Sequence, residues 1–219
     1  MYQTEAIPDV LRQLGSSLLS DALRDVGFPN YTAAPGIAPI NRSDVTAGPV
    51  RTSTCARAGT GDLHSFLPLA TFIDSCESGD VLVFGPAEGA SAGSVWGSIC
   101  TAAALSRGCA GVIIDGFMRD TLDIAATALP VFSRGALAQD CLGRSMVAET
   151  NADIVCGGVR VQPGDWVVAD VDGVVFIPAK NLEDAIYAAG EKRQKEQLLL
   201  EAVRSGSSLT DAVGRLRTL

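Results

Sequence analysis

Residues 79–115 decide the fold of this chain, and they read GDVLVFGPAEGASAGSVWGSICTAAALSRGCAGVIID. The apolar run 81–84 ends at a Gly-Pro pair and has the length of a buried strand. An Ala-rich stretch over 95–107 has helical apolar spacing, and Gly108 is a typical residue just beyond a helix end. Residues 111–115 supply the next strand. This order predicts a βαβ unit, whose loops gather at the carboxyl ends of its strands, where ligands usually bind.

The segments that flank this unit add helices and a hairpin. Residues 10–26 carry apolar side chains at helical spacing, and the Gly-Ser-Ser triplet at 15–17 is expected to divide them into two helices. Residues 45–58 are expected to be extended. Two apolar runs within 166–177, separated by Asp-Val-Asp-Gly, predict a hairpin. A charged segment over 182–216 predicts a long helix followed by a short one.

Length and composition limit the number of domains. The chain has 219 residues, of which 47% are hydrophobic and 23 are glycine. A chain of this size and composition is typical of one globular domain with a sizeable core. We therefore expect one catalytic-type α/β domain over residues 1–179, with residues 180–219 as a C-terminal helical tail of the same domain.

The charge balance and the N-terminal sequence argue against two classes of partner. Lysine and arginine number 17 against 25 acidic residues, a net charge of −8, so a surface for nucleic-acid backbone is not expected. The start MYQTEAIPDV lacks the basic and apolar regions of a signal peptide, and the apolar runs are too short to span a bilayer. We expect a cytoplasmic protein that contacts neither nucleic acid nor membrane.

The residue inventory also excludes several kinds of chemistry. His64 is the one histidine, so paired-histidine mechanisms and His-rich zinc sites are excluded, and this residue fits an ordinary surface or capping role. Residues 1–179 contain no lysine, which argues against Schiff-base chemistry and a P-loop. The cysteines form no CxxC pair, so we expect them to be reduced and mostly buried. They are Cys55, Cys76, Cys100, Cys109, Cys141 and Cys156. If the chain is an enzyme, its chemistry must therefore rely on arginine, carboxylates, backbone amides and an oxygen-ligated metal.

The sharpest local feature is an arginine beside a carboxylate, in the segment DGFMRD at 115–120 that is expected to form a loop after a strand. Arg119 can bind a carboxylate through two donors, while Asp120 can hold a divalent cation that polarises a neighbouring carbonyl. An alternative stays open, in which Asp120 caps a helix over 121–126 and pairs with Arg119 at the surface.

The glycine-rich loop before the helix at 95–107 provides a second candidate element. Free amides at a helix start attract anions through hydrogen bonds and the helix dipole. The amides near Ser98, Ile99 and Cys100 are candidates for this role. The alternative is an ordinary connection between a strand and a helix.

Several separated blocks, in the right order, resemble the family that includes class II 4-hydroxy-4-methyl-2-oxoglutarate aldolases, oxaloacetate decarboxylases and the regulator of ribonuclease E activity. The blocks are 20–23, 79–83, 108–120, 129–132 and 161–175. The resemblance covers nearly the whole chain and implies an α/β sandwich, with a β-rich core flanked by helices. It also implies assembly as a homotrimer or a hexamer made of two trimers.

The same resemblance implies roles for residues of the two candidate elements. Arg119 would bind the pyruvyl carboxylate and Asp120 would hold Mg²⁺ or Mn²⁺. The turn at Gly97 and Ser98 would contact the substrate, with the amides after it as donors. Those amides belong to Ile99 and Cys100. A glutamate from the tail of a neighbouring subunit would approach the metal waters. Glu196 is the best match, with Glu191 and Glu201 as alternatives.

This sequence departs from the family at Ser98, where the family generally has an acidic residue. A serine hydroxyl can hydrogen-bond a metal-bound water, but it cannot act as a carboxylate base. Glu88 on the preceding loop is a candidate to compensate for the missing carboxylate, with a solvated surface glutamate as the favoured alternative. The expected activity is metal-dependent retro-aldol cleavage or decarboxylation of a 2-oxo dicarboxylic acid to give pyruvate. The alternatives are a non-catalytic binding protein, like the ribonuclease regulator, and an enzyme of other specificity on this fold.

Overall fold

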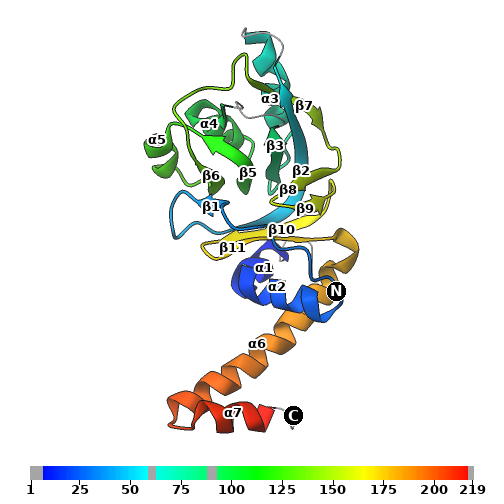
Figure 1. Ribbon diagram of the computed structural model, residues 1–219, viewed down its shortest axis with the longest axis vertical. Coiled ribbons are helices and arrows are strands. Elements are labelled where there is room, and N and C mark those ends of the chain that lie inside the picture. Colours follow the sequence, from blue (N-terminus) through cyan, green and yellow to red (C-terminus); the bar gives the residue numbers. More distant parts are fainter. Residues whose placement is uncertain (1–6, 59–62, 88–92, 217–219) are drawn as a thin grey trace.

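A mixed sheet forms the centre of the molecule in the computed structural model, which describes residues 7–58, 63–87 and 93–216 (Figure 1). Within these residues the strand order is β1-β6-β5-β3-β2-β10-β11, with β4 paired to β5 and β7 paired to β2. The strands of this sheet are β1 (Ala38–Pro39), β2 (Thr46–Arg57), β3 (Val81–Ala87), β4 (Ser94–Trp96), β5 (Gly111–Met118), β6 (Val131–Ala136), β7 (Ser145–Thr150), β10 (Trp166–Asp170) and β11 (Gly173–Ile177). The neighbours β2, β3, β5 and β6 run parallel, and the β10–β11 hairpin joins β2 antiparallel.

Alternate residues of the parallel strands enter two different cores. Leu82 and Phe84 of β3 pack with three helices on one face of the sheet, whereas Val81 and Val83 face the opposite side. The helices of the first face are α3 (Leu67–Asp74), α4 (Ser98–Ser106) and α5 (Thr121–Ala125). A small antiparallel pair, β8 (Ile154–Cys156) and β9 (Val159–Val161), covers the other face. Burial on both faces explains the continuous apolar runs in the sequence.

The β10–β11 hairpin separates the second core from a third one. Val167 and Phe176 face the sheet core, while Val168 and Val175 face helices on the other side. These helices are α1 (Ile7–Leu14), α2 (Ser16–Asp25) and α6 (Leu182–Arg204). The two faces of the hairpin therefore pack against two different apolar cores.

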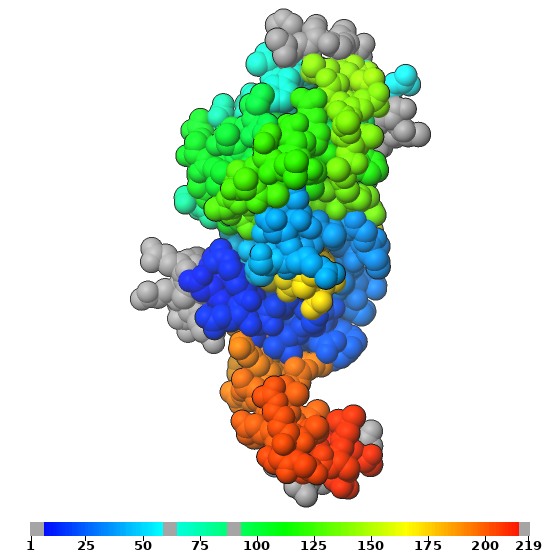
Figure 2. Space-filling model, turned by 90° about the vertical axis from the view of Figure 1, so that its left-hand side faces the viewer, coloured from blue at the N-terminus to red at the C-terminus, as the bar shows by residue number. Residues whose placement is uncertain are grey.

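The C-terminal helices extend away from this body (Figures 1 and 2). The first turns of α6 are buried against α1 and α2 through Leu182, Ala185 and Ile186. Further along, Leu198 and Leu200 are exposed, and α7 (Leu209–Leu216) follows at the far end. No helix among the described residues has the length and apolar character needed to cross a membrane.

Most of the expected elements are confirmed. The mixed α/β class, the β-rich core flanked by helices and the C-terminal helical tail are all present. The first helical segment divides at Gly15, and the β3–α4–β5 crossover and the β10–β11 hairpin form as expected.

Two element boundaries were wrong. The first residues of the expected 95–107 helix form β4 instead, because they pair with the end of β5, and the helix begins after Gly97. The expected loop at 115–120 is strand as far as Met118, because β5 continues alongside both β4 and β6.

The expectation that every cysteine is reduced was also wrong. Cys76 and Cys109 form a disulfide, whereas Cys55, Cys100, Cys141 and Cys156 are free. The physical reason is topological. Cys76 lies shortly before β3 and Cys109 shortly before β5, so the parallel pairing of these strands brings the two Cα atoms to 6.5 Å, within the usual range for a disulfide.

Candidate active site

The turn between β4 and α4 forms one side of the site. β4 pairs with the last residues of β5, and the buried Trp96 indole donates a hydrogen bond to Thr101 Oγ1 of α4 at 2.9 Å. Gly97 occupies the N-cap position of α4, with extended backbone dihedrals. The helix therefore begins directly beside the end of β5.

Arg119 and Asp120 follow β5 and meet this turn. The Arg119 amide donates to the Trp96 carbonyl oxygen at 2.9 Å. Asp120 adopts a left-handed conformation, with φ 57° and ψ 39°, which aspartate tolerates better than most residues. Its carboxylate lies at the start of α4, where Oδ2 accepts hydrogen bonds from the Ser98 amide and the Ser98 hydroxyl, both at 3.0 Å.

This geometry bears on the alternative in which Asp120 caps the helix that follows it. Asp120 does hold the N-cap position of α5, but its side chain makes no capping hydrogen bond there. It caps α4 instead, because the left-handed backbone turns the carboxylate toward Ser98. The Arg119–Asp120 ion pair is present but long, at 3.9 Å from Nε to Oδ2.

Gly97 makes the close approach of Asp120 possible. A Cβ at this position would lie 2.7 Å from Asp120 Oδ2, which is closer than a carbon and an oxygen can pack. The missing side chain therefore leaves room for the carboxylate at the start of the helix. The need for glycine here is steric and not conformational, because the extended backbone of Gly97 is one that any residue can adopt.

The hydrogen bonds to Asp120 keep it ionised. The Ser98 amide, followed by the Ser98 hydroxyl, lowers the pKa of the Asp120 carboxyl below 3.8, and the charge of Arg119 acts in the same direction. The Asp120 side chain is 34% exposed, and within the described residues its Oδ1 accepts no hydrogen bond. One oxygen of a charged carboxylate thus remains open to a cation.

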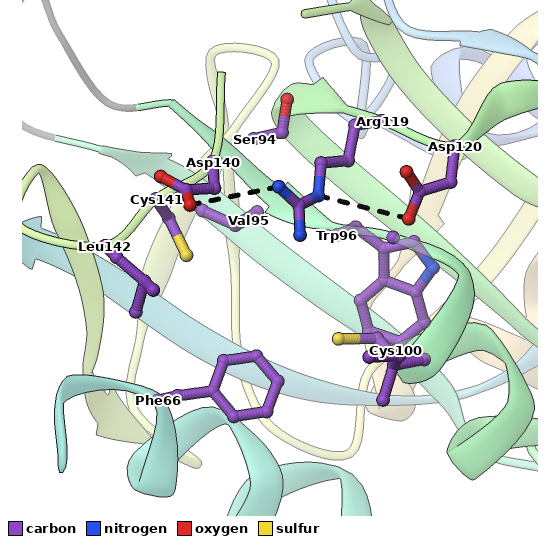
Figure 3. Close-up of a pocket in the computed structure, with 12 residues that line it drawn as sticks. Phe66, Ser94, Val95, Trp96, Cys100, Arg119, Asp120, Asp140, Cys141 and Leu142 are labelled. Atoms are coloured by element: carbon purple, nitrogen blue, oxygen red, sulfur yellow. Dashed lines mark ion pairs between the residues drawn. The ribbon is translucent and has the colours of Figure 1, made fainter. Parts of the chain in front are cut away.

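A cavity of about 190 Å³ opens in front of these residues. Figure 3 shows the Arg119 guanidinium between Asp140 and Asp120, with Nη1 at 3.9 Å from Asp140 Oδ2. Phe66 and Leu142 line the opposite side of the cavity (Figure 3). The cavity therefore has a charged end and an apolar end.

Asp140 and the apolar wall were missing from the sequence prediction. Asp140 lies on the loop after β6, and this loop is held in place by Ser94 of β4, whose amide donates to the Gln139 carbonyl oxygen at 2.8 Å. Arg144 Nη1 lies 3.4 Å from Asp140 Oδ1. A signal was available, because β6 is the parallel neighbour of β5 and its carboxyl end reaches the same edge of the sheet.

The two thiols that line the cavity are poor nucleophiles. Burial raises the pKa of Cys100 to about 11 and also raises the pKa of Cys141. Both thiols are protonated at neutral pH, and the thiolate is the reactive form. Nucleophilic catalysis by cysteine is therefore not supported here.

Of the predicted residues, Gly97, Ile99, Cys100, Arg119 and Asp120 line this cavity. Ser98 does not line it and reaches the site through its hydrogen bonds to Asp120. Glu196 is not part of it. Within one chain, Glu196 lines a separate hollow with Arg193 and the first residues of α2. Its approach to a neighbour's site stays a prediction about the assembly. His64 lies in a short 3-10 helix, η2 (Leu63–Phe66), and Glu88 lies outside the described residues.

The donor set fits a hard divalent cation that is shared with a substrate. Among the residues that the structure describes, no three His, Cys, Asp or Glu side chains form a metal-binding group. Asp120 offers a carboxylate oxygen and Ser98 a hydroxyl, and Mg²⁺ is commonly bound by one or two protein carboxylates with water and substrate oxygens. The arrangement differs from a closed structural site, which uses four protein ligands.

Comparisons with known proteins agree with this architecture. The family model described as "RraA-like: Aldolase/RraA" matches residues 16–176. A relative from Halalkalibacterium halodurans, named "Putative 4-hydroxy-4-methyl-2-oxoglutarate aldolase", is 31% identical over 192 residues, which cover 88% of this chain and 86% of the relative.

Two solved structures share the fold. An uncharacterized protein from Pseudomonas syringae pv. tomato is 30% identical, with a TM-score of 0.83 over 95% of this chain and 96% of that chain. RraAS2 from Streptomyces coelicolor, described as an unusual member of the RNase ES inhibitor RraA protein family, is 23% identical, with a TM-score of 0.77 over 87% and 93% of the two chains. On the sequence match and the shared fold together, this chain belongs to the RraA-like family of aldolases and RraA proteins.

Proposed function

We propose that the chain is a divalent-metal-dependent carbon–carbon lyase that releases pyruvate from a 2-oxo acid. One observation carries the proposal: Arg119 and Asp120 line the same cavity as Ile99 and Cys100 in the first turn of α4. The aldolase name of the relative with 31% identity supports this reaction class. The 2-oxo dicarboxylic acids named by the family resemblance, 4-hydroxy-4-methyl-2-oxoglutarate and oxaloacetate, are the first substrates to test.

Different residues around the cavity bind the substrate carboxylate and the metal. The Arg119 guanidinium binds the carboxylate beside the 2-oxo group through parallel N–H donors. Asp120 would hold Mg²⁺ or Mn²⁺ next to it, and the Ser98 hydroxyl would hydrogen-bond a metal-bound water. When bound, the metal supplies Lewis-acid stabilisation of the negative charge on the 2-oxo oxygen, worth several kcal/mol.

The first amides of α4 add hydrogen-bond donors. Amides in the first turn of a helix have no acceptor within the helix. The Ser98 amide donates to Asp120, which leaves the amides of Ile99 and Cys100 to orient a substrate oxygen. Their contribution is smaller than that of the metal, because a helix dipole stabilises an anion by about 0.3–1 kcal/mol.

The two proposed reactions share one bond cleavage. In the retro-aldol direction the C3–C4 bond breaks, its electron pair stays on C3 as the pyruvate enolate, and the C4 hydroxyl loses its proton to solvent as it becomes a carbonyl. In decarboxylation the same electron pair stays on C3, while carbon dioxide leaves. The enolate then takes a proton from solvent in both cases. Ser98 cannot act as a carboxylate base, so decarboxylation, which needs no initial proton removal, depends on that position least.

The proposed setting is a cytoplasmic homotrimer or hexamer with a small 2-oxo acid as its ligand. In such an assembly Glu196 of one tail would approach the Asp120 site of the next subunit. The projection of α6 away from its own body supports this arrangement (Figure 1). Sedimentation velocity of the purified chain measures the assembly directly.

The experiment that tests the proposal measures formation of the pyruvate enolate through hydrogen exchange. The methyl protons of pyruvate should exchange with deuterium from solvent in the presence of Mg²⁺ or Mn²⁺, because exchange reverses the final protonation step. Pyruvate release from oxaloacetate and from 4-hydroxy-4-methyl-2-oxoglutarate, above the rate of metal alone, is the second readout. EDTA should abolish both.

A wild-type protein that shows neither exchange nor release, with either metal, overturns the lyase proposal. The second candidate, a non-catalytic binding protein of the RraA type, is favoured by one observation, the absence of a carboxylate at position 98. That candidate predicts a stable fold without metal-dependent exchange.

A further inference from the structure

The two ends of the cavity differ in the chemistry they offer a substrate. Arg119, Asp120 and Asp140 stand in a row at one end (Figure 3). Toward the other end the walls are formed by Phe66, Leu142 and neighbouring apolar groups (Figure 3). A second, smaller hollow shares Phe66 with the first and continues along apolar side chains that include Leu69 and Val147.

The charged end has one cation for two carboxylates. Arg119 lies 3.9 Å from Asp120 Oδ2 and 3.9 Å from Asp140 Oδ2, and the proposed function assigns its donors to the carboxylate beside the 2-oxo group. Among the described residues that line the cavity, no other lysine or arginine is present. The internal segments 59–62 and 88–92, which lie outside the described residues, contain no basic residue in their sequence.

Arg144 does not supply a second carboxylate site. Its Nη1 lies 3.4 Å from Asp140 Oδ1 and donates to the Leu142 carbonyl oxygen at 3.2 Å, and Arg144 is not part of the cavity wall. Its positive charge is thus already paired. A carboxylate at the far end of a substrate would lie against apolar groups. Burying such a charge without a partner is unfavourable.

We propose that the apolar end of the cavity receives an uncharged, apolar group, so that the preferred substrates are 4-hydroxy-2-oxo acids with one carboxylate. This inference rests on the proposed function and narrows its substrate class. Cleavage breaks the C3–C4 bond, leaves the electron pair on C3 of pyruvate, and releases an uncharged aldehyde or ketone whose carbonyl oxygen is the former C4 hydroxyl. The hydroxyl proton goes to solvent and C3 takes one from solvent, with no net oxidation or reduction.

The test compares two substrates that differ at the far end. Pyruvate release is measured from 4-hydroxy-2-oxohexanoate, which yields propanal, and from 4-hydroxy-2-oxoglutarate, which yields glyoxylate. We expect kcat/KM for the hexanoate to be at least about tenfold higher, the scale on which an apolar pocket discriminates. Exchange of the pyruvate methyl protons is measured in parallel. Pyruvate lacks the substrate atoms beyond C3, so this exchange reports enolate formation independently of the apolar end of the cavity.

A charge introduced into the apolar wall should reverse the preference. Leu142→Arg is expected to lower the ratio of the two kcat/KM values by about tenfold or more, since the new guanidinium pairs with the second carboxylate of the glutarate. Leu122→Arg is the matched control, because Leu122 is 86% exposed on α5 and does not line the cavity. It should leave the ratio unchanged. The ratio is insensitive to the fraction of folded protein.

The outcomes separate the two proposals. Exchange together with a preference for the hexanoate supports both. Exchange together with a preference for the glutarate or oxaloacetate overturns the uncharged subsite and leaves the lyase proposal standing. Absence of both exchange and release overturns the lyase proposal and the subsite with it.

Discussion

Helices α2 and α4 begin with the same local arrangement, yet among the described residues only the aspartate at α4 keeps a carboxylate oxygen that accepts no hydrogen bond. Each helix starts with a serine whose amide and hydroxyl donate to a distant aspartate. At α2 the Ser16 amide donates to Asp170 Oδ2 at 2.8 Å and its hydroxyl to Asp170 Oδ1 at 2.6 Å, and the Asp172 amide also donates to Oδ1 at 2.9 Å. At α4 both Ser98 groups donate to Oδ2 of Asp120.

The difference lies in which oxygens are used. Both oxygens of Asp170 are engaged, and Ser16 is 2% exposed, so this aspartate stabilises the fold. Both aspartates line a hollow, but within the described residues only Asp120 of the two keeps an oxygen, Oδ1, that accepts no hydrogen bond. A helix-capping carboxylate can therefore bind a cation through an oxygen that the cap leaves unused.

The largest expected effect comes from replacing the two aspartates by asparagine. Asp120→Asn can still turn its one oxygen toward Ser98, but it loses the charge that holds the metal. We expect pyruvate proton exchange to fall about a thousandfold, from the loss of several kcal/mol of metal stabilisation, with an unchanged melting temperature.

Asp170→Asn is the matched control for that change. Because donors approach both oxygens of Asp170, an asparagine must place its NH₂ against a donor. We expect the free energy of unfolding in urea to fall by about 1–3 kcal/mol, with exchange kinetics per folded molecule unchanged. Equal losses of activity in the two variants would remove the distinction drawn between the two helix starts.

The N-cap glycines provide a second matched pair, with a smaller effect. A Cβ at Gly97 would lie 2.7 Å from Asp120 Oδ2, whereas a Cβ at Gly15 would lie 3.5 Å from Asp170 Oδ2. We expect Gly97→Ala to displace the Asp120 carboxylate and to lower exchange about a hundredfold, the usual scale for a misplacement of 1 Å. Metal titration of the exchange rate should show weaker metal binding.

Gly15→Ala should act on stability instead. Gly15 has φ 79° and ψ 164°, a backbone region that is essentially restricted to glycine and costs other residues about 1–3 kcal/mol. Thermal unfolding should therefore show a lower melting temperature, while exchange is retained. Retained activity in Gly97→Ala would show that Asp120 does not need its present position.

The smallest effect is expected at the serines. Ser98→Ala removes the second-largest cause of the lowered pKa of Asp120 and keeps the largest, the amide hydrogen bond. The pKa of Asp120 should then rise toward 3.8. Since the carboxylate must be ionised to hold a cation, activity should be lost at a higher pH on the acid side and be little changed at neutral pH. Exchange rates across the acid limb measure this shift.

Ser16→Ala is the corresponding control at α2. It removes a buried hydrogen bond to Asp170, so unfolding should become easier by about 1 kcal/mol without a change in the acid limb. An identical pH profile for Ser98→Ala and the wild type would contradict the part assigned to the Ser98 hydroxyl.

The elements that local pattern determines could be predicted from the sequence. The runs at 81–84 and 111–115 are apolar because both faces of β3 and β5 are buried, and the hairpin at 166–177 has its own turn signal. The start of β4 could not be predicted in this way. Trp96 continues the helical pattern of 95–107, and only its pairing with the distant end of β5 makes it a strand residue.

The residues of the candidate site also fall into those that local sequence predicts and those that it does not. Arg119 and Asp120 were predicted because they are adjacent in sequence, and Ser98 because the family resemblance marks its position. Asp140 reaches the cavity through contacts between Ser94 and the loop after β6, which no local pattern records. Its apolar counterpart Phe66 arrives from the segment before α3. The part of the site that we propose to separate one substrate from another is therefore the part assembled from distant segments.

The β10–β11 hairpin has a consequence for folding cooperativity. Its residues alternate between the sheet core and the helical core, with Val167 facing one and Val168 the other. Loss of the helical layer would expose half of the hairpin to water and weaken the strand that adjoins β2. The two layers are therefore expected to melt in a single transition, so a destabilising substitution among the N-terminal helices would lower the melting temperature of the whole molecule, the cavity included.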